Sequence, residues 1–288
     1  MNFAMEQPHC TCWTRIVTFA LVLLLAACGA LPSQVDRPPS AARRAGDSTL
    51  GRIAADSTPD AAQTGFRLMP MGSYSLDARI QLARRAQDTL DLQYYLVRND
   101  RSGRLLMRNL RDAAMRGVRV RLLLDDLYTA GNDAMFLGLA GFPNVEVRLF
   151  NPFCCARETL AGKYLASIND FTRLNHRMHN KLFVADGAVA VMGGRNIGDE
   201  YFTRSETSNF VDMDVLAVGA AVPMLAGLFD RYWNSAQAYP VGAIVRGSSN
   251  AEELQRNFDR LVDEGEQTTA LPQTRPRRPA SRSSRTGP

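Results

Sequence analysis

The chain has 288 residues, enough for one or two domains, and its 45% apolar and 22% charged residues are ordinary values for a globular protein. Five arginines in an acid-free C-terminal tail, residues 274–288, account for the net charge of +5. The rest of the chain is close to neutral, which argues against a nucleic-acid-binding protein. The five cysteines show neither a disulfide framework nor the Cys/His spacing of a zinc site, so we expect no metal and no cofactor.

The first 27 residues have the pattern of a secretory signal peptide. Ile16 to Ala27 is almost continuously apolar and follows Arg15, but it is too short to span a bilayer. Residues 25–28, Leu-Ala-Ala-Cys, resemble a bacterial lipobox, which implies cleavage before Cys28 and lipidation of Cys28. Gly29 at the next position favours the outer over the inner membrane. We therefore expect a lipoprotein of the bacterial cell envelope that faces the periplasm.

Composition divides the remaining chain into three parts. Residues 28–64 are rich in Ala, Ser, Pro, Asp and Arg without apolar periodicity, so we expect a disordered tether. Residues 65–240 carry alternating apolar patterns and form the predicted globular domain. Residues 241–288 are expected to be a partial linker with one short helix, around Ala251–Val262, followed by a disordered basic tail.

Helical and strand periods alternate through the first half of the globular domain. The expected elements are a helix around Leu76–Ala83, a strand at Thr89–Val97, a helix at Ser102–Arg116, a strand at Val118–Leu124, a helix near Asp133–Leu139 and a strand at Val145–Phe150. This order predicts an α/β fold with a mixed, largely parallel central sheet and helices on both faces. Asn151–Asn175 has no strong period and is predicted to be a substrate-facing loop.

The second half of the domain begins with a hairpin pattern. Arg177–Ala185 and Ala188–Met192 are the expected strands, and Asp186-Gly187 between them is a strong two-residue turn signal. A strand at Phe210–Val218 and an amphipathic helix from Met224 to Trp233 complete the domain.

A set of polar residues at fixed spacing surrounds this hairpin. His179, Lys181, Asp186 and Asn196 follow the pattern H-x-K-x(4)-D-x(6)-G-G-x-N. Residues two apart on a strand share a face, so His179 and Lys181 should project into one cleft. A neutral imidazole can attack phosphorus, and an ammonium group and an amide can stabilise the phosphate oxygens. The chain therefore carries candidate groups for attack on a phosphodiester.

The two glycines of the pattern, Gly193 and Gly194, are predicted to leave the backbone bare so that a phosphate can approach closely. Asp186 belongs to the catalytic pattern, but its place at the turn indicates a structural role, holding the turn or the lysine region, rather than that of a general base. An imidazole nucleophile also needs an orienting carboxylate. The pattern resembles that of the phospholipase D superfamily, whose members keep such an acid on the next strand. The resemblance implies Asp212 for this role, with Asp214, on the same strand face, as the alternative.

Other conspicuous residues receive ordinary interpretations. His176 lies three residues before His179 and is expected to be a surface or loop histidine. Tyr94, Tyr95 and Trp233 are expected to be core aromatics.

The motif is that of the phospholipase D superfamily, and a wider stretch, residues 69–239, resembles bacterial cardiolipin synthases, especially the C-type branch. The resemblance rests on LDLQYYLVRNDRSGRLL, RGVRVRLLLDD, NVEVRLFNPF and NHRMHNKLFVADGAVAVMGGRNIGDEYF. It implies phosphatidyl transfer: a phosphatidylglycerol phosphate is attacked, a phosphatidyl-histidine forms, and the hydroxyl of a second lipid displaces the enzyme. Phospholipids in the membrane are then the expected partners, and nucleic acid is not.

The chain departs from this family in one respect. Active sites of the superfamily pair two such motifs, and the three histidines here, His9, His176 and His179, supply only one. Either the chain is a truncated half, which the likeness to two-motif enzymes favours, or a homodimer supplies a second His179. Three functions stay open: a phosphatidyltransferase or phospholipase D, a dimeric periplasmic endonuclease, and an inactive lipoprotein fragment.

Overall fold

The structure, a computed structural model, describes residues 31–167 and 170–263. Within them lies an eight-stranded sheet in the order β1-β7-β6-β5-β2-β3-β4-β8. The strands are β1 Thr64–Met69, β2 Thr89–Tyr94, β3 Arg119–Asp125, β4 Val145–Phe150, β5 Leu182–Ala185, β6 Val189–Gly193, β7 Asp214–Gly219 and β8 Ala238–Pro240. Strands β2, β3 and β4 run parallel, and the other pairings are antiparallel. The mixed α/β class is confirmed, but the sheet is less parallel than predicted because β5, β6 and β7 form a meander.

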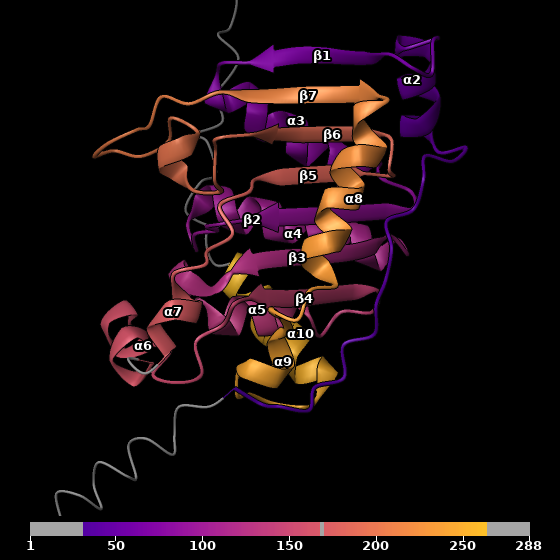
Figure 1. Cartoon of the computed structure of the whole chain (residues 1–288). Coiled ribbons are helices and arrows are strands. Elements are labelled where there is room, and N and C mark those ends of the chain that lie inside the picture. The colour runs from indigo at the N-terminus through magenta and orange to yellow at the C-terminus, as the bar shows by residue number, and fades with distance from the viewer. Residues whose placement is uncertain (1–30, 168–169, 264–288) are drawn as a thin grey trace, which may run out of the picture.

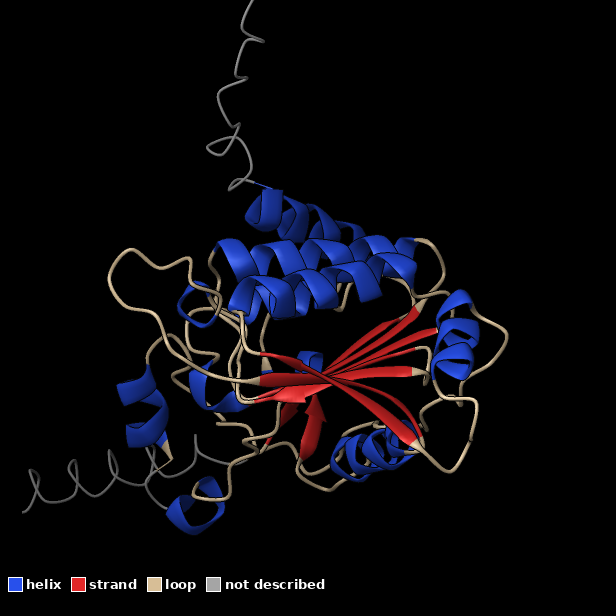
Figure 2. Ribbon diagram, turned by 90° about the horizontal axis from the view of Figure 1, so that it is seen from above, coloured by secondary structure: helices blue, strands red, loops and turns tan. Residues whose placement is uncertain are grey.

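Helices cover both faces of this sheet, as predicted (Figure 2). They are α2 Thr49–Ser57, α3 Gly72–Arg85, α4 Arg101–Met115, α5 Asp133–Leu139, α6 Leu160–Ala166, α7 Phe171–Leu174, α8 Ala221–Trp233, α9 Val241–Ile244 and α10 Ala251–Asp263. Helices α3, α4, α5 and α10 pack behind the sheet in the view of Figure 1, and α8 crosses its front. No helix in the described ranges is long and apolar enough to cross a membrane.

The alternation of side chains along the central strands builds two apolar layers. Leu122 of β3 belongs to the larger cluster, on the side of α3 and α4. Its neighbour Leu123 points to the other side and packs in the cluster that contains Phe229 and Trp233 of α8. Because both faces are covered, these strands are apolar on both sides, and their positions could be predicted closely.

The predicted disordered tether, residues 28–64, is wrong over its described part. The chain there runs along the sheet and forms α2 (Figure 1). Arg121 donates a hydrogen bond to the backbone oxygen of Ser40 at 3.0 Å, and Arg148 donates one to that of Pro38 at 2.8 Å. Both arginines come from buried strands far along the sequence. The local composition of the segment therefore could not reveal that it is ordered.

The predicted loop Asn151–Asn175 is also partly wrong, because it contains α6 and α7. The helix α6 is held by Lys163, whose buried ammonium donates to the backbone oxygen of Asp126 and to the hydroxyl of Thr129, both at 2.7 Å. A seven-residue helix with one inward lysine has too little apolar period to be recognised from sequence.

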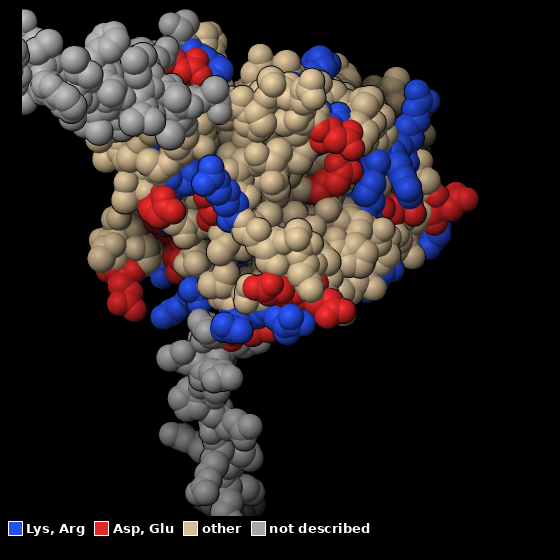
Figure 3. Space-filling model, turned by 90° about the horizontal axis from the view of Figure 1, so that it is seen from below, with Lys and Arg blue, Asp and Glu red and all other residues tan. Residues whose placement is uncertain are grey.

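Acidic and basic side chains are interspersed on the face shown in Figure 3, around a broad area of uncharged residues. No continuous basic surface appears on that face. The predicted signal peptide, the predicted lipidation site Cys28 and the basic tail, residues 274–288, lie outside the described residues.

Candidate functional site

His179 and Lys181 lie in the extended segment that leads into β5, at the edge where the parallel strands end (Figure 1). Strand β5 begins later than predicted, so both residues precede it rather than lie in it. They nevertheless share one side, because both contact the ring of Tyr95. The imidazole centroid of His179 is 4.6 Å from the ring centroid, and Lys181 Nζ is 5.3 Å from it.

The electrostatics of the pair suit attack on a phosphate. Lys181 is buried, and its ammonium donates to the backbone oxygen of His179 at 2.7 Å. Burial lowers the pKa of Lys181 to about 8, although the charge of Asp212 opposes the shift. Burial and the positive charge of Lys181 lower the pKa of His179. Near pH 7 the imidazole is therefore neutral and the ammonium is still charged.

The segment that carries His179 is fixed by Asp125, the last residue of β3, which the sequence analysis did not single out. Asp125 accepts a hydrogen bond from the backbone N–H of Met178 at 2.7 Å and forms an ion pair with Arg177 at 3.1 Å. Burial raises the pKa of Asp125 to about 6, against the effect of Arg177. The sequence did hold a signal for this role. An acidic residue follows a buried parallel strand, at the same edge of the sheet as the histidine.

Two of the three aromatics singled out in the sequence are core residues, as predicted, since Tyr94 and Trp233 are fully buried. Tyr95 is different. It is half-buried and packs against both His179 and Tyr128, whose ring centroid is 5.3 Å away. The alternation of side chains along the predicted strand Thr89–Val97 could have distinguished the buried Tyr94 from Tyr95, because neighbouring strand residues point to opposite faces.

Asn196 is buried beside this edge and is bonded within the protein. Its side-chain oxygen accepts from the backbone N–H of Leu96 at 3.2 Å, and its amide nitrogen donates to the hydroxyl of Tyr201 at 3.0 Å. An amide nitrogen has two hydrogens, so one remains for a phosphate oxygen. Donation to phosphate stays a prediction.

The two glycines of the motif lie against the carboxylates of the candidate orienting acids. A Cβ on Gly194 would lie 2.0 Å from a carboxylate oxygen of Asp212, and one on Gly193 would lie 2.2 Å from a carboxylate oxygen of Asp214. The space over their backbone is thus filled by carboxylates. Gly193 and Gly194 therefore let the two acids approach the backbone, and their predicted role in phosphate approach stays a prediction.

The two candidate orienting acids differ in their surroundings. Asp214 is fully buried, pairs with Arg79 at 3.1 Å and accepts from the hydroxyl of Ser75, so it is a structural carboxylate. Asp212 is half-buried, accepts from the backbone N–H of Met213 and acts electrostatically on Lys181. Within the described residues no hydrogen bond joins Asp212 to His179, and its orienting role stays a prediction.

Asp186 lies at the opposite end of β5 from Lys181. It occupies the turn with φ +51°, followed by Gly187 with φ +60°. Its buried carboxylate accepts from the backbone N–H groups of Gln87, Asp88 and Thr89 at 2.8 to 3.1 Å. Asp186 thereby joins the hairpin to the start of β2, an arrangement that supports the structural role predicted for it.

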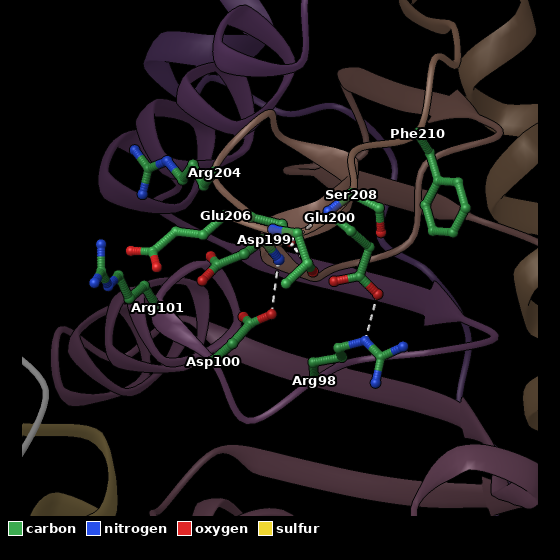
Figure 4. Close-up of a pocket in the computed structure, with 11 residues that line it drawn as sticks. Arg98, Asp100, Arg101, Asp199, Glu200, Arg204, Glu206, Ser208 and Phe210 are labelled. Atoms are coloured by element: carbon green, nitrogen blue, oxygen red, sulfur yellow. Dashed lines mark hydrogen bonds and ion pairs between the residues drawn. The ribbon is translucent and has the colours of Figure 1, made fainter.

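A separate pocket of about 620 Å³ lies next to the site (Figure 4). Its lining includes Arg98, which pairs with Glu200, and Asp100, which accepts from the backbone N–H of Asp199 at 2.7 Å. Because four acidic residues against three arginines line it and none of the motif side chains does, we do not assign the chemistry to it.

His176 is exposed, as predicted for a surface histidine. The part of the chain that the structure describes contains no group of His, Cys, Asp and Glu residues that could hold a metal ion.

Comparisons with known proteins give a family for this chain. Residues 79–233 match the family described as cardiolipin synthase, PLD-like domain. The chain is 49% identical to cardiolipin synthase C of Escherichia coli over 174 residues, which are 59% of this chain and 36% of that protein. It is 34% identical to a cardiolipin synthase of Staphylococcus aureus over 57% of this chain and 31% of that protein. The chain thus spans about a third of the length of these relatives.

Two solved structures are also similar. Phosphatidylserine synthase of Haemophilus influenzae aligns with 74% of this chain and 48% of its own, at 14% identity and a TM-score of 0.48. NucT from Helicobacter pylori aligns with 62% of this chain and 98% of its own, at 14% identity and a TM-score of 0.45.

Proposed function

Because the chain belongs to the phospholipase D-like family of cardiolipin synthases, we propose that it transfers phosphatidyl groups, with His179 attacking the phosphodiester of phosphatidylglycerol. The observation that carries this proposal is the pair of neighbouring groups at the sheet edge. An exposed imidazole with a lowered pKa lies next to an ammonium that is still charged near pH 7. The first is a nucleophile for phosphorus and the second neutralises its oxygens.

The first step forms a bond from an imidazole nitrogen of His179 to phosphorus and breaks the bond from phosphorus to the glycerol oxygen. The departing glycerol oxygen takes up a proton. In the second step the hydroxyl of another phosphatidylglycerol attacks phosphorus, loses its proton and releases the histidine, which yields diphosphatidylglycerol. Water in place of that hydroxyl would give phosphatidic acid. Lys181 and Asn196 hold the phosphate oxygens through both steps.

The proton for the departing glycerol requires a second acid. We propose that another copy of His179 supplies it in a homodimer that pairs the two sheet edges. One copy would then be the nucleophile that is released in the second step, while the other gives a proton to the departing glycerol and takes one from the incoming hydroxyl.

The substrate is a membrane lipid, and an anchored chain would meet it directly. We propose that Cys28 is lipidated and that the domain faces the periplasm, with the outer membrane as the favoured site. The lipobox-like residues before Cys28 support this part of the proposal.

The test is to incubate the purified chain with phosphatidylglycerol vesicles and separate the lipid products, with a His179→Ala variant in parallel. We expect diphosphatidylglycerol or phosphatidic acid from the wild-type chain and neither from the variant. Absence of both products from the wild-type chain, or equal amounts from the variant, would contradict the proposal. Duplex DNA is included as a competing substrate, and its cleavage in place of the lipid would favour a nuclease. The interspersed charges in Figure 3 lead us to expect no cleavage.

A further inference from the structure

Helix α6 exposes apolar side chains on a part of the molecule that projects from the sheet edge (Figure 1). The exposed fractions are 37% for Leu160, 39% for Tyr164 and 74% for Leu165. The only charged residue of the helix, Lys163, points inward and bonds to the end of β3. The outer side of α6 is therefore free of charge, which is unusual for a short surface helix.

The N-terminal part of the chain reaches the same region. Leu31 and Pro32 line a pocket together with Cys154 and Cys155. The sulfur of Cys154 lies 4.0 Å from the backbone oxygen of Ala166, the last residue of α6. Cys28 is three residues before Leu31, so the chain allows at most about 10 Å between them. A lipid on Cys28 would hold this end of the molecule at a bilayer.

Helix α6 is also connected to the candidate site by a chain of packed rings. The ring of Tyr164 lies 5.5 Å from that of Phe153. Phe153 packs in one buried cluster with Tyr95, which contacts His179. A surface that met the membrane through α6 would therefore present the reactive edge to the lipid headgroups.

We propose that the outer side of α6, with Leu160, Tyr164 and Leu165, enters the interfacial layer of the bilayer and orients the reactive edge toward it. The inference rests on the proposed function, because it assumes a chain anchored at Cys28 that acts on phospholipids. Short apolar surfaces next to a lipid anchor bind membranes through their buried area, and Tyr is favoured where one end of a ring stays wet.

The test places a tryptophan on α6 in the anchored full-length chain. Leu165→Trp is compared with Met224→Trp on α8, since Met224 is 75% exposed and Leu165 is 74% exposed. Trp233, the native tryptophan within the described residues, is fully buried and contributes a constant background. The chain is reconstituted into vesicles of phosphatidylethanolamine and phosphatidylglycerol with brominated acyl chains, which quench nearby indoles.

We expect several-fold stronger quenching of Leu165→Trp than of Met224→Trp. Equal quenching of the two, or stronger quenching at residue 224, would overturn the proposal. The molar mass without lipid is measured for the wild-type and Leu165→Asp chains. A dimer that Leu165→Asp dissociates would assign α6 to a contact between copies and overturn the proposal as well.

A second measurement separates this inference from the proposed function. In a Cys28→Ser chain, Leu165→Asp should lower the fraction that floats with vesicles by about tenfold, while Met224→Asp should not. His179→Ala should float like its parent and make no lipid product. If flotation depends on Leu165 but no lipid product forms, the proposed function alone is contradicted. If lipid product forms but flotation does not depend on Leu165, the role of α6 alone is contradicted.

Discussion

The two ends of strand β5 hold residues of one sequence motif in opposite physical states. At the turn, the carboxylate of Asp186 is buried and satisfied by three backbone N–H groups. At the other end, His179 is exposed and Lys181 is buried with its pKa lowered to about 8.

The difference shows which motif residues stabilise the fold and which are kept reactive. A fully bonded carboxylate gains little by meeting a ligand, because its acceptor capacity is already used. A lysine with a lowered pKa gains interaction when a phosphate arrives, because the anion compensates its lost hydration. Changes at the turn should therefore alter stability, and changes at the other end should alter activity.

The largest effect is expected for His179→Ala. Loss of the nucleophile should lower the turnover of phosphatidylglycerol by about 10³-fold or more. The melting temperature should stay within a degree or two, because an exposed side chain contributes little to stability. His176→Ala is the matched control and should keep nearly full activity. A large drop in melting temperature with His179→Ala would contradict the view that His179 serves activity and Asp186 serves stability.

Lys181→Met should lower turnover by about 10²- to 10³-fold, since one charged donor to the reacting phosphate is lost. The pH profile of the wild-type chain sharpens this point. Activity should fall as the pH rises through about 8, where Lys181 loses its proton. It should also fall in acid, at a pH below the ordinary histidine pKa, where His179 becomes protonated. If activity falls only near pH 10.5, the ordinary pKa of lysine, the lowered pKa of Lys181 is contradicted.

Asp186→Ala should lower the free energy of unfolding by about 2–4 kcal/mol, because three backbone N–H groups lose their acceptor. Chemical denaturation measures this loss. The activity of the fraction that remains folded should change less than about threefold. Asp186→Asn keeps an acceptor oxygen and tolerates positive φ, so its loss of stability should be smaller. A folded Asp186→Asn chain without activity would assign this carboxylate a chemical role.

Asp125→Asn should lower turnover by about tenfold, less than the losses at His179 and Lys181, with the affinity for substrate nearly unchanged. The amide oxygen can still accept from Met178, but the charge that pairs with Arg177 is gone. Protonation of wild-type Asp125 as the pH falls through about 6 removes the same charge. Because burial raises this pKa above its unfolded value, the charged form costs stability above pH 6, and protonation below it favours the folded state. The variant should therefore lose less activity than the wild-type chain between pH 7 and 5.5.

The central strands could be predicted from the sequence because burial dictates their residues. Strand β4 and helix α5 match their predicted bounds, Val145–Phe150 and Asp133–Leu139, residue for residue. The motif spacing likewise predicted the turn at Asp186. These features depend on local patterns of burial and on backbone conformations that few residues adopt.

The parts that could not be predicted depend on partners far along the chain. The segment around Ser40 is ordered by arginines of β3 and β4, and α6 is held by the end of β3. The site shows the same limit, since the contact of Asp125 with Met178 joins residues 53 positions apart. Long-range polar contacts leave no local period in a sequence, so Asp125 and Tyr95 were missed as neighbours of His179.

The central claim is that His179 is the nucleophile, and a covalent intermediate tests it most directly. The chain is mixed with phosphatidylglycerol, quenched in denaturant at alkaline pH, digested with trypsin and examined by mass spectrometry. Cleavage after Arg173, Arg177 and Lys181 places His176 and His179 on separate peptides. The account predicts a phosphatidyl adduct on the peptide Met178–Lys181 and none on the peptide with His176. Lipid turnover without an adduct on His179, or an adduct on His176 instead, would contradict it.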